Sequence, residues 1–279
     1  MVEERHIVAE ENEYGRIVLM DSITHANEEF GPGAVLIGGS WMGVVPVSFA
    51  TRYHPKAVLC NDAGVGVNGA GINALYYLDG LGIPGAAVAS DSAMIANGRS
   101  HWDTGAISFV NHWARACGCE PGMSVREAAR ALLRWTPQMK EDAPSRESRE
   151  VVYSDEEGEI VVADSIKYIN ADDEDRVICV GSHGGETTCG YAVDVSPRGV
   201  VTSDGGGGRD NAGTRGLKIL AKGGIPAVAV SVHSAPIGDG LSIYEDGVVS
   251  VVNEPAAALG LRAGMRARVA AMEMLRRPK

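Results

Sequence analysis

The sequence predicts an α/β protein made of two internally duplicated units. Each unit is expected to be a mostly parallel sheet flanked by helices, and the two to be related by an approximate two-fold axis. A glycine-rich motif occurs twice, as NDAGVGVNGAG at residues 61–71 and as SDGGGGRDNAG at residues 203–213. Flanking motifs keep the same offset of 142 residues, which separates Ser40 from Ser182 as it separates Asp62 from Asp204. Runs of Val, Ile and Ala precede these motifs without polar alternation, as in strands buried on both faces of a parallel sheet.

The repeat divides the chain into a first unit at residues 1–134, a linker at 135–150 and a second unit at 151–279. The linker is charged, contains Pro137 and Pro144, and shows no helical or strand periodicity. A chain of 279 residues is long enough for two domains of ordinary size, each with its own core.

Within the first unit, apolar runs predict strands at residues 16–20, 34–37, 57–59, 86–89 and 106–110. Helical spacing and turn residues predict helices at 47–53, 69–78 and 123–134, and a polar loop at 90–103. The last helix has the clearest start, because Ser124 is followed at the third position by Glu127. The second unit repeats this order from residue 159 to about residue 275.

Composition narrows the classes of function. The 25 Lys and Arg residues are outnumbered by 36 Asp and Glu, which gives a net charge of −11 and no basic cluster, so a nucleic-acid partner is not expected. No apolar run is long enough for a membrane span, and the first residues lack an apolar signal core, so we expect a cytoplasmic protein without a membrane partner. Five scattered cysteines do not suggest a disulfide framework, and homo-oligomerisation is left open.

Each glycine motif follows a strand and precedes a helix, an order that aims backbone N–H groups and a helix N-terminus at one point. Such a turn is a ready anion site. We therefore expect the second turn to hold a substrate carboxylate or phosphate, with arginine beside it and polar residues at neighbouring strand ends. The predicted substrate-binding residues are Gly205, Gly206, Gly207, Gly208, Arg209, Ser182, Ser40 and Asn61.

The duplication also offers an internal control, because polar groups found in only one unit are better candidates for chemistry. His183 stands where the first unit has Trp41, and His233 stands where it has Asp91. Histidine can act as acid, base or metal ligand, although a single histidine beside a strand is more often structural. Cys60 precedes the first turn and would be a nucleophile if its thiolate were stabilised there, or otherwise a small buried hydrophobe.

Asp62 and Asp204 occur in both units. Each carboxylate either ties down its own glycine turn or acts as a base or metal ligand; a divalent metal is not required by the sequence and is left open.

The leading functional prediction is an enzyme that cleaves a C–N or similar bond of a small anionic metabolite, a hydrolase or lyase, in a cleft between the two units. His183 or His233 would be its general base, with Cys60 or a water oriented by Asp62 or Asp204 as nucleophile. One alternative is a non-catalytic protein that binds a small carboxylate or phosphate. The other is an NAD-dependent oxidoreductase, since Gly64, Gly66 and Gly69 fit the dinucleotide fingerprint.

Overall fold

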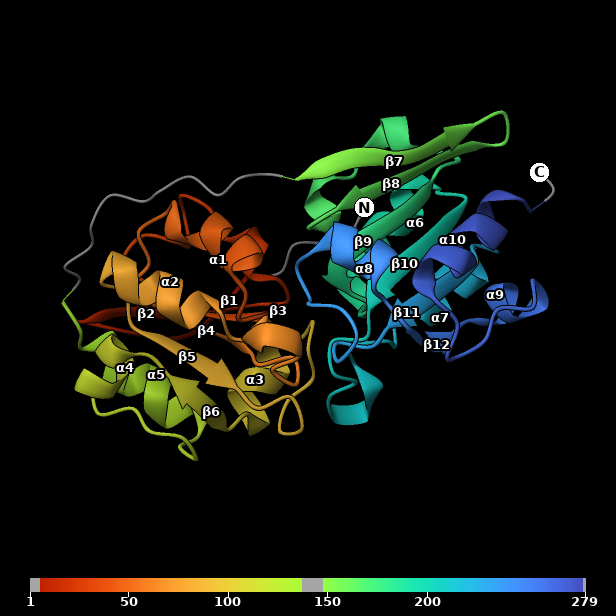
Figure 1. Ribbon diagram of the computed structural model, residues 1–279. Helices are drawn as coiled ribbons and strands as arrows, with labels where there is room; N and C mark the ends of the chain where they lie inside the picture. Colours follow the sequence, from red (N-terminus) through yellow and green to blue (C-terminus); the bar gives the residue numbers. More distant parts are fainter. Residues whose placement is uncertain (1–5, 137–147, 278–279) are drawn as a thin grey trace.

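The computed structural model describes residues 6–136 and 148–277, which form two units (Figure 1). Each unit is built on a six-stranded mixed sheet with helices on both faces. The α/β class and the two similar units are thereby confirmed, and the matching layout agrees with a duplication.

The strands of the first sheet lie side by side in chain order. They are β1 (His6–Asn12), β2 (Gly15–Met20), β3 (Val35–Trp41), β4 (Ala57–Asn61), β5 (Gly85–Val88) and β6 (Ile107–Val110). The pairs from β2 to β5 are parallel, whereas β1 and β6 pair antiparallel at the two edges. The sheet is therefore mostly parallel with two antiparallel edges.

The second sheet repeats this arrangement. Its strands are β7 (Arg149–Asp155), β8 (Gly158–Ala163), β9 (Val177–His183), β10 (Gly199–Ser203), β11 (Ala227–Val230) and β12 (Val249–Val252). Again the central pairs are parallel and the edge strands β7 and β12 are antiparallel.

Helices cover both faces of each sheet. The first unit contains α1 (Val44–Thr51), α2 (Ala74–Leu81), α3 (Gly98–Thr104), α4 (His112–Ala116) and α5 (Val125–Leu133). The second contains α6 (Glu186–Val195), α7 (Leu217–Lys222), α8 (Gly240–Glu245), α9 (Glu254–Ala258) and α10 (Ala267–Leu275). Short 3₁₀ turns lie between them: η1 (Ile23–His25), η2 (Val67–Gly69), η3 (Ile166–Tyr168), η4 (Ala171–Asp173) and η5 (Arg209–Asn211).

The strand cores explain the apolar runs of the sequence. Along β2, Ile17 and Leu19 pack with helices α3 and α5, while Val18 and Met20 pack with α1 and α2 on the opposite face. Because helices cover both faces of the sheet, successive residues from Ile17 to Met20 are all apolar. The alternation of apolar and polar residues that is typical of a half-exposed strand is therefore absent from this part of β2. The capping box of Ser124 and Glu127 is also present, at the start of α5.

Three local predictions differ from the structure. The edge strands β1 and β7 were not predicted, because they are half exposed and their sequences are largely polar. The predicted loop at 90–103 contains all but the last residue of α3, whose first turn is capped by the Asn97 side chain. Of the predicted linker, residues 137–147 lie outside the described residues, and Arg149 and Glu150 already belong to β7.

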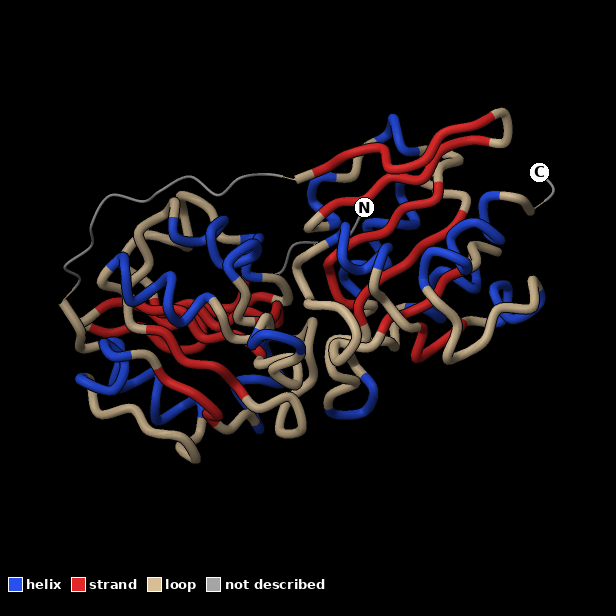
Figure 2. The backbone as a smooth tube through the Cα atoms, viewed as in Figure 1, coloured by secondary structure: helices blue, strands red, loops and turns tan. Residues whose placement is uncertain are grey.

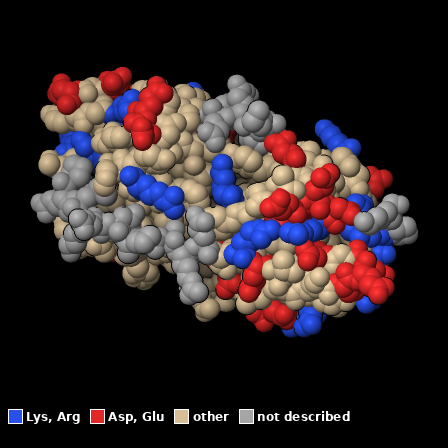
Figure 3. All heavy atoms as spheres, turned by 90° about the horizontal axis from the view of Figure 1, so that it is seen from above, with Lys and Arg blue, Asp and Glu red and all other residues tan. Residues whose placement is uncertain are grey.

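The two units meet through the loops at the carboxyl ends of their strands, and Figure 2 shows these loops between the two sheets. An apolar cluster at this junction combines residues of both units: Trp41, Ala63, Ala70, Ile95, Ala212, Val232 and Ile237. Across the described ranges, no helix has the length and apolar character needed to cross a membrane. On the face seen in Figure 3, charges of both signs are interspersed, most densely over one of the units.

Candidate site at the junction of the two units

The second glycine turn uses its own N–H groups internally. Gly205 donates to the Ser203 side chain at 3.2 Å, and Gly206 donates to Asp204 Oδ1 at 3.0 Å. The next two N–H groups donate to backbone carbonyls, that of Gly207 to Asp204 and that of Gly208 to Gly206. The four donors predicted to hold an anion are thus already satisfied within the chain, so this conformation leaves none of them for a ligand.

Asp62 and Asp204 serve their turns in the same way. Asp62 Oδ1 accepts the N–H groups of Gly64 and Ser90, both at 3.0 Å. Asp204 Oδ1 accepts those of Gly206 and Val232, and its Oδ2 accepts the Ser250 hydroxyl at 2.9 Å. Each carboxylate therefore ties its glycine turn to the loop that follows the next strand. Of the two interpretations drawn from the sequence, the structural one accounts for these contacts.

The two turns pack against each other, and Arg209 is part of that contact. Its backbone N–H donates to the Ser90 carbonyl at 2.7 Å, and its guanidinium donates to the Ser92 carbonyl at 3.0 Å. In the other direction, the N–H of Val67 donates to the Val232 carbonyl at 2.8 Å. Arg209 thus spans the junction instead of pointing into a ligand cavity.

The same packing bears on the dinucleotide alternative. A Cβ atom on Gly66 would lie 3.2 Å from the Val232 side chain, so the second unit closes over the first turn. Asn61 is also used locally, since its side chain accepts the Ala63 N–H and lies 3.0 Å from His101. A pyrophosphate at this turn would need space that the second unit fills.

The predicted catalytic residues lie in different environments. Cys60 is fully buried in the core beside β3, and burial raises the pKa of its thiol far above the ordinary value. His233 is exposed on the loop after β11. His183 is buried at the end of β9 and lines a cavity whose wall includes neither of the other two. The structure therefore does not assemble these three residues into one site.

That cavity lies between the units and has a volume of about 20 Å³, room for roughly one water molecule. Its walls come from η1, the end of β3 and the start of α1 in the first unit, and from η3, the end of β9 and α6 in the second. Three residues predicted for the site, Ser40, Ser182 and His183, are among its lining residues. We call it the junction cavity.

Both serines have structural partners. Ser40 Oγ accepts the N–H of Ile23, and Ser182 Oγ accepts the N–H of Ile166, each at 3.0 Å. These matching bonds hold η1 and η3 against the ends of β3 and β9. The serines therefore shape the cavity in both units alike, and the chemical differences must come from other residues.

His183 is the most distinctive of these. Its side chain is only 4% exposed, and its ring lies edge-on to Trp41 with the ring centroids 6.0 Å apart. The Gly185 N–H donates to Nδ1 at 3.0 Å, so Nδ1 is the acceptor and Nε2 carries the proton. Burial lowers the pKa of His183 to about 4, which keeps the ring neutral near pH 7. In this tautomer Nε2 is a hydrogen-bond donor and cannot accept a proton as the predicted general base.

A second group, which the sequence did not single out, adjoins the same cavity: Lys167 and Tyr191 line it, and His25 of the first unit contacts Tyr191. Lys167 Nζ donates to the Tyr191 hydroxyl at 2.8 Å, and that hydroxyl lies 2.9 Å from His25 Nε2. An ammonium group can only donate, so the tyrosine oxygen accepts from Lys167 and can pass its own proton to His25. His25 is 2% exposed. A usable signal existed in Lys167, because the matching position after β2 is Thr24, at the offset of 143 residues that also relates Asp21 to Asp164.

Both positive and negative groups line the junction cavity. Helix α6 begins there without a side-chain cap, and Thr187 and Thr188 of its first turn are lining residues. A helix N-terminus and the Lys167 ammonium both favour an anion. Asp21 also lines the cavity, and its Oδ1 accepts the Gly98 N–H at 3.2 Å. Within the described ranges, no three His, Cys, Asp or Glu side chains are grouped as they would be around a metal ion.

No family model, curated protein or solved structure matches this chain.

Proposed function

We propose that this protein binds a small organic anion and that the junction cavity receives one oxygen atom of its carboxylate or of another small polar head group. One observation carries the proposal. His183 lines the cavity, and its Nε2–H donates to none of the residues that the structure describes. A neutral imidazole whose other nitrogen already accepts a hydrogen bond has this one N–H donor left for a ligand. A ligand oxygen in the cavity can accept from it.

The surroundings support an oxygen acceptor. Lys167 and the start of α6 add positive charge and further donors, while the Asp21 carboxylate faces the same space. A group that both accepts and donates, such as a carboxylic acid derivative with a neighbouring amine or amide, fits this mixture. The volume of about 20 Å³ limits the enclosed part to about one oxygen atom of the head group, with the rest of the metabolite outside.

Acetate is a suitable probe because it is little more than a carboxylate. We expect a titration with acetate to shift the imidazole NMR signals of His183. His183→Asn places an oxygen near the Nδ1 position, which preserves an acceptor for Gly185, but removes the Nε2 donor. It should weaken acetate binding about ten- to a hundredfold, the value of a hydrogen bond to a charged group.

His183→Gln is the matched control, because its amide N–H reaches close to the position of Nε2 and should retain much of the affinity. The proposal fails if acetate shifts no junction signal in the wild type, or if the Asn and Gln variants bind acetate equally well.

The predicted hydrolase is the second candidate, and the Lys167–Tyr191–His25 chain favours it. A water beside Tyr191 would give its proton to the Tyr191 oxygen while the tyrosine proton moves to His25 Nε2. The water oxygen would then add to a substrate carbonyl carbon whose oxygen accepts from His183 Nε2–H. Departure of the amine breaks the C–N bond and takes the proton back from the chain.

Tyr191→Phe separates the two candidates. For a hydrolase, it should lower turnover of small amides about 10²–10⁴-fold, the usual contribution of a general acid or base. Acetate affinity should stay close to that of the wild type, because the phenol is not the proposed ligand donor. A wild-type protein that binds acetate but hydrolyses no amide of a small carboxylic acid from pH 5 to pH 9 is a binding protein.

A further inference from the structure

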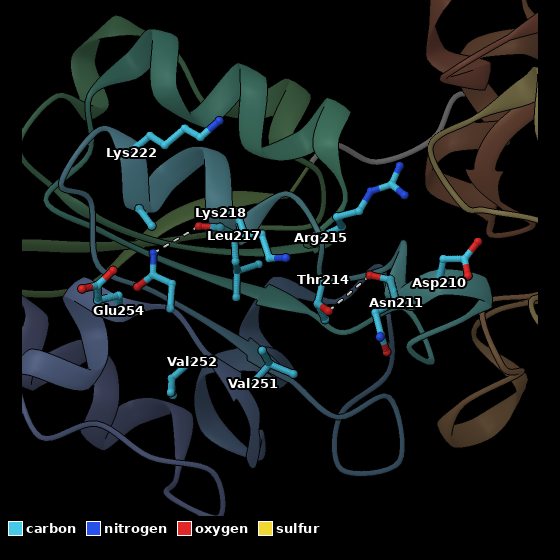
Figure 4. A pocket seen from close by; sticks show the side chains of 12 residues that line it. Asp210, Asn211, Thr214, Arg215, Leu217, Lys218, Lys222, Val251, Val252 and Glu254 are labelled. Carbon is cyan, nitrogen blue, oxygen red and sulfur yellow. Dashed lines mark hydrogen bonds between the residues drawn. The ribbon is translucent and has the colours of Figure 1, made fainter.

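A larger groove lies on the second unit, away from the junction cavity. It has a volume of about 700 Å³, within the range of small-molecule sites, and lies between α7 and the edge strand β12 (Figure 4). Its lining residues are Asp210, Asn211, Thr214, Arg215, Leu217, Lys218, Ala221, Lys222, Val251, Val252, Asn253 and Glu254. We call it the α7 groove.

One wall of the α7 groove is cationic. Figure 4 shows Lys218 and Lys222 on neighbouring turns of α7, with Arg215 just before the helix. Arg215 is held by Glu186 at 3.0 Å. Neither lysine has an ion pair with any residue in 6–136 or 148–277, so both ammonium groups are available to a ligand.

The floor of the groove is apolar. Leu217, Val251 and Val252 line it, and Val251 remains 37% exposed although it lies in a strand. Asn253 fixes the floor by donating from its side chain to the Leu217 carbonyl at 3.3 Å. The acidic residues of the groove, Asp210 and Glu254, lie near its two ends, with the cations and the apolar floor between them (Figure 4).

The duplication shows that the fold does not require these cations. At the matching positions of the first unit, Asn73, Tyr76 and Gly80 replace Arg215, Lys218 and Lys222. α2 nevertheless packs on its sheet as α7 does. Tyr76 is 80% exposed, so this helix face lies open in the first unit too. The cationic character of the α7 groove is therefore a property of the second unit alone.

We propose that the α7 groove binds an amphipathic organic anion: an acidic head group held by Lys218 and Lys222, and an apolar body laid on Leu217, Val251 and Val252. The lysines supply charge where the rest of the protein would repel an anion. The aliphatic floor gives no polar partner and so selects a hydrocarbon or aromatic body. This site is independent of the junction cavity and of the function proposed for it.

A matched pair of dyes tests both halves of the proposal. 8-Anilinonaphthalene-1-sulfonate carries an aromatic body and a sulfonate, and N-phenyl-1-naphthylamine has the same body without the charge. We expect the sulfonate dye to bind the native protein with increased fluorescence. Lys218→Ala and Lys222→Ala should each weaken it about three- to fivefold, and the double variant about tenfold or more.

Three controls locate the binding. Arg262→Ala removes one exposed positive charge of the second unit outside the groove and should leave the affinity for the sulfonate dye unchanged. The neutral dye should bind the lysine variants as it binds the wild type. Acetate titration of His183 should also be unchanged in the lysine variants, which separates this site from the junction cavity. Failure of the sulfonate dye to bind the native wild type, or equal affinity in the wild type and the double lysine variant, would overturn the proposal.

Discussion

Mild acid should destabilise this protein through two buried histidines, His101 in α3 and His183 at the end of β9. His101 is fully buried, and its Nε2 accepts from the Asn61 side-chain amide at 3.0 Å. His183 Nδ1 accepts from the Gly185 N–H. Each ring is therefore neutral in the folded protein, and burial lowers the pKa of both to about 4 from the ordinary 6.5.

The direction of the effect follows from proton binding. In the unfolded chain these histidines bind protons below about pH 6.5, whereas in the folded protein they do so only near pH 4. Because the unfolded state binds more protons in this window, stability falls as the pH falls from about 6.5 to about 4. At pH 5 each histidine should lower the free energy of unfolding by about 2 kcal/mol relative to pH 7, and the pair by about 4 kcal/mol.

Urea unfolding at pH 7 and at pH 5 measures this difference. His101→Gln and His183→Gln keep polar side chains of similar length but cannot bind the proton. Whatever each variant loses at pH 7, its stability should decrease about 2 kcal/mol less than that of the wild type between the two pH values. The double variant should combine both effects, because the two residues share no partner. If wild type and variants lose the same stability on acidification, the two rings are not buried in the neutral form.

Three further predictions concern the glycine turns and Cys60. In thermal unfolding, Gly206→Ala should lower the melting temperature more than Gly207→Ala does. Both glycines have positive φ, but a Cβ atom on Gly206 would lie 2.6 Å from the Ala63 carbonyl oxygen, whereas one on Gly207 would meet nothing within 4 Å. Equal losses would show that the contact between the turns contributes nothing. Val65→Gly should raise the free energy of unfolding by about 0.5–1 kcal/mol, because Val65 has a φ of +65° and the matching residue of the second unit is Gly207. An unchanged or lower melting temperature would contradict this. Alkylation of Cys60 at pH 8 should follow global unfolding, and should be slower than that of the half-buried Cys117; equally fast labelling of both would show that Cys60 is accessible.

The fold could be predicted because its signals are local and repeated. Strands such as β4 are apolar on both faces. The glycine-rich motif occurs twice in the chain, once after β4 and once after β10. The edge strands were missed because β1 and β7 expose much of one face and read as polar loops. Strands are predicted from the spacing of buried apolar residues, so the prediction is weakest for strands that are largely exposed.

The function of the glycine turn could not be predicted in the same way. The motif correctly indicates a turn rich in N–H groups, but not which acceptors those groups meet. Asp204 lies directly before the turn and accepts from it, and the first unit packs over the rest. The proximity of Lys167, Tyr191 and His25 depends on how the two units dock, with His25 and Tyr191 separated by 166 positions. No spacing rule within one unit contains that information.

The two units share one scaffold, and the positions where they differ mark the places where chemistry can be expected. Shared residues form much of the junction: the paired turns, their aspartates, and the serines that hold η1 and η3. His183 replaces Trp41 at one wall of the junction cavity, and the two rings lie against each other. The Trp41 ring of the first unit is thus matched in the second unit by the His183 ring, whose Nε2–H is a hydrogen-bond donor. The lysines of α7 differ from the first unit in the same way. Because shared residues maintain much of the scaffold and the two α7 lysines are exposed, substitutions of Lys218 and Lys222 should change binding far more than stability.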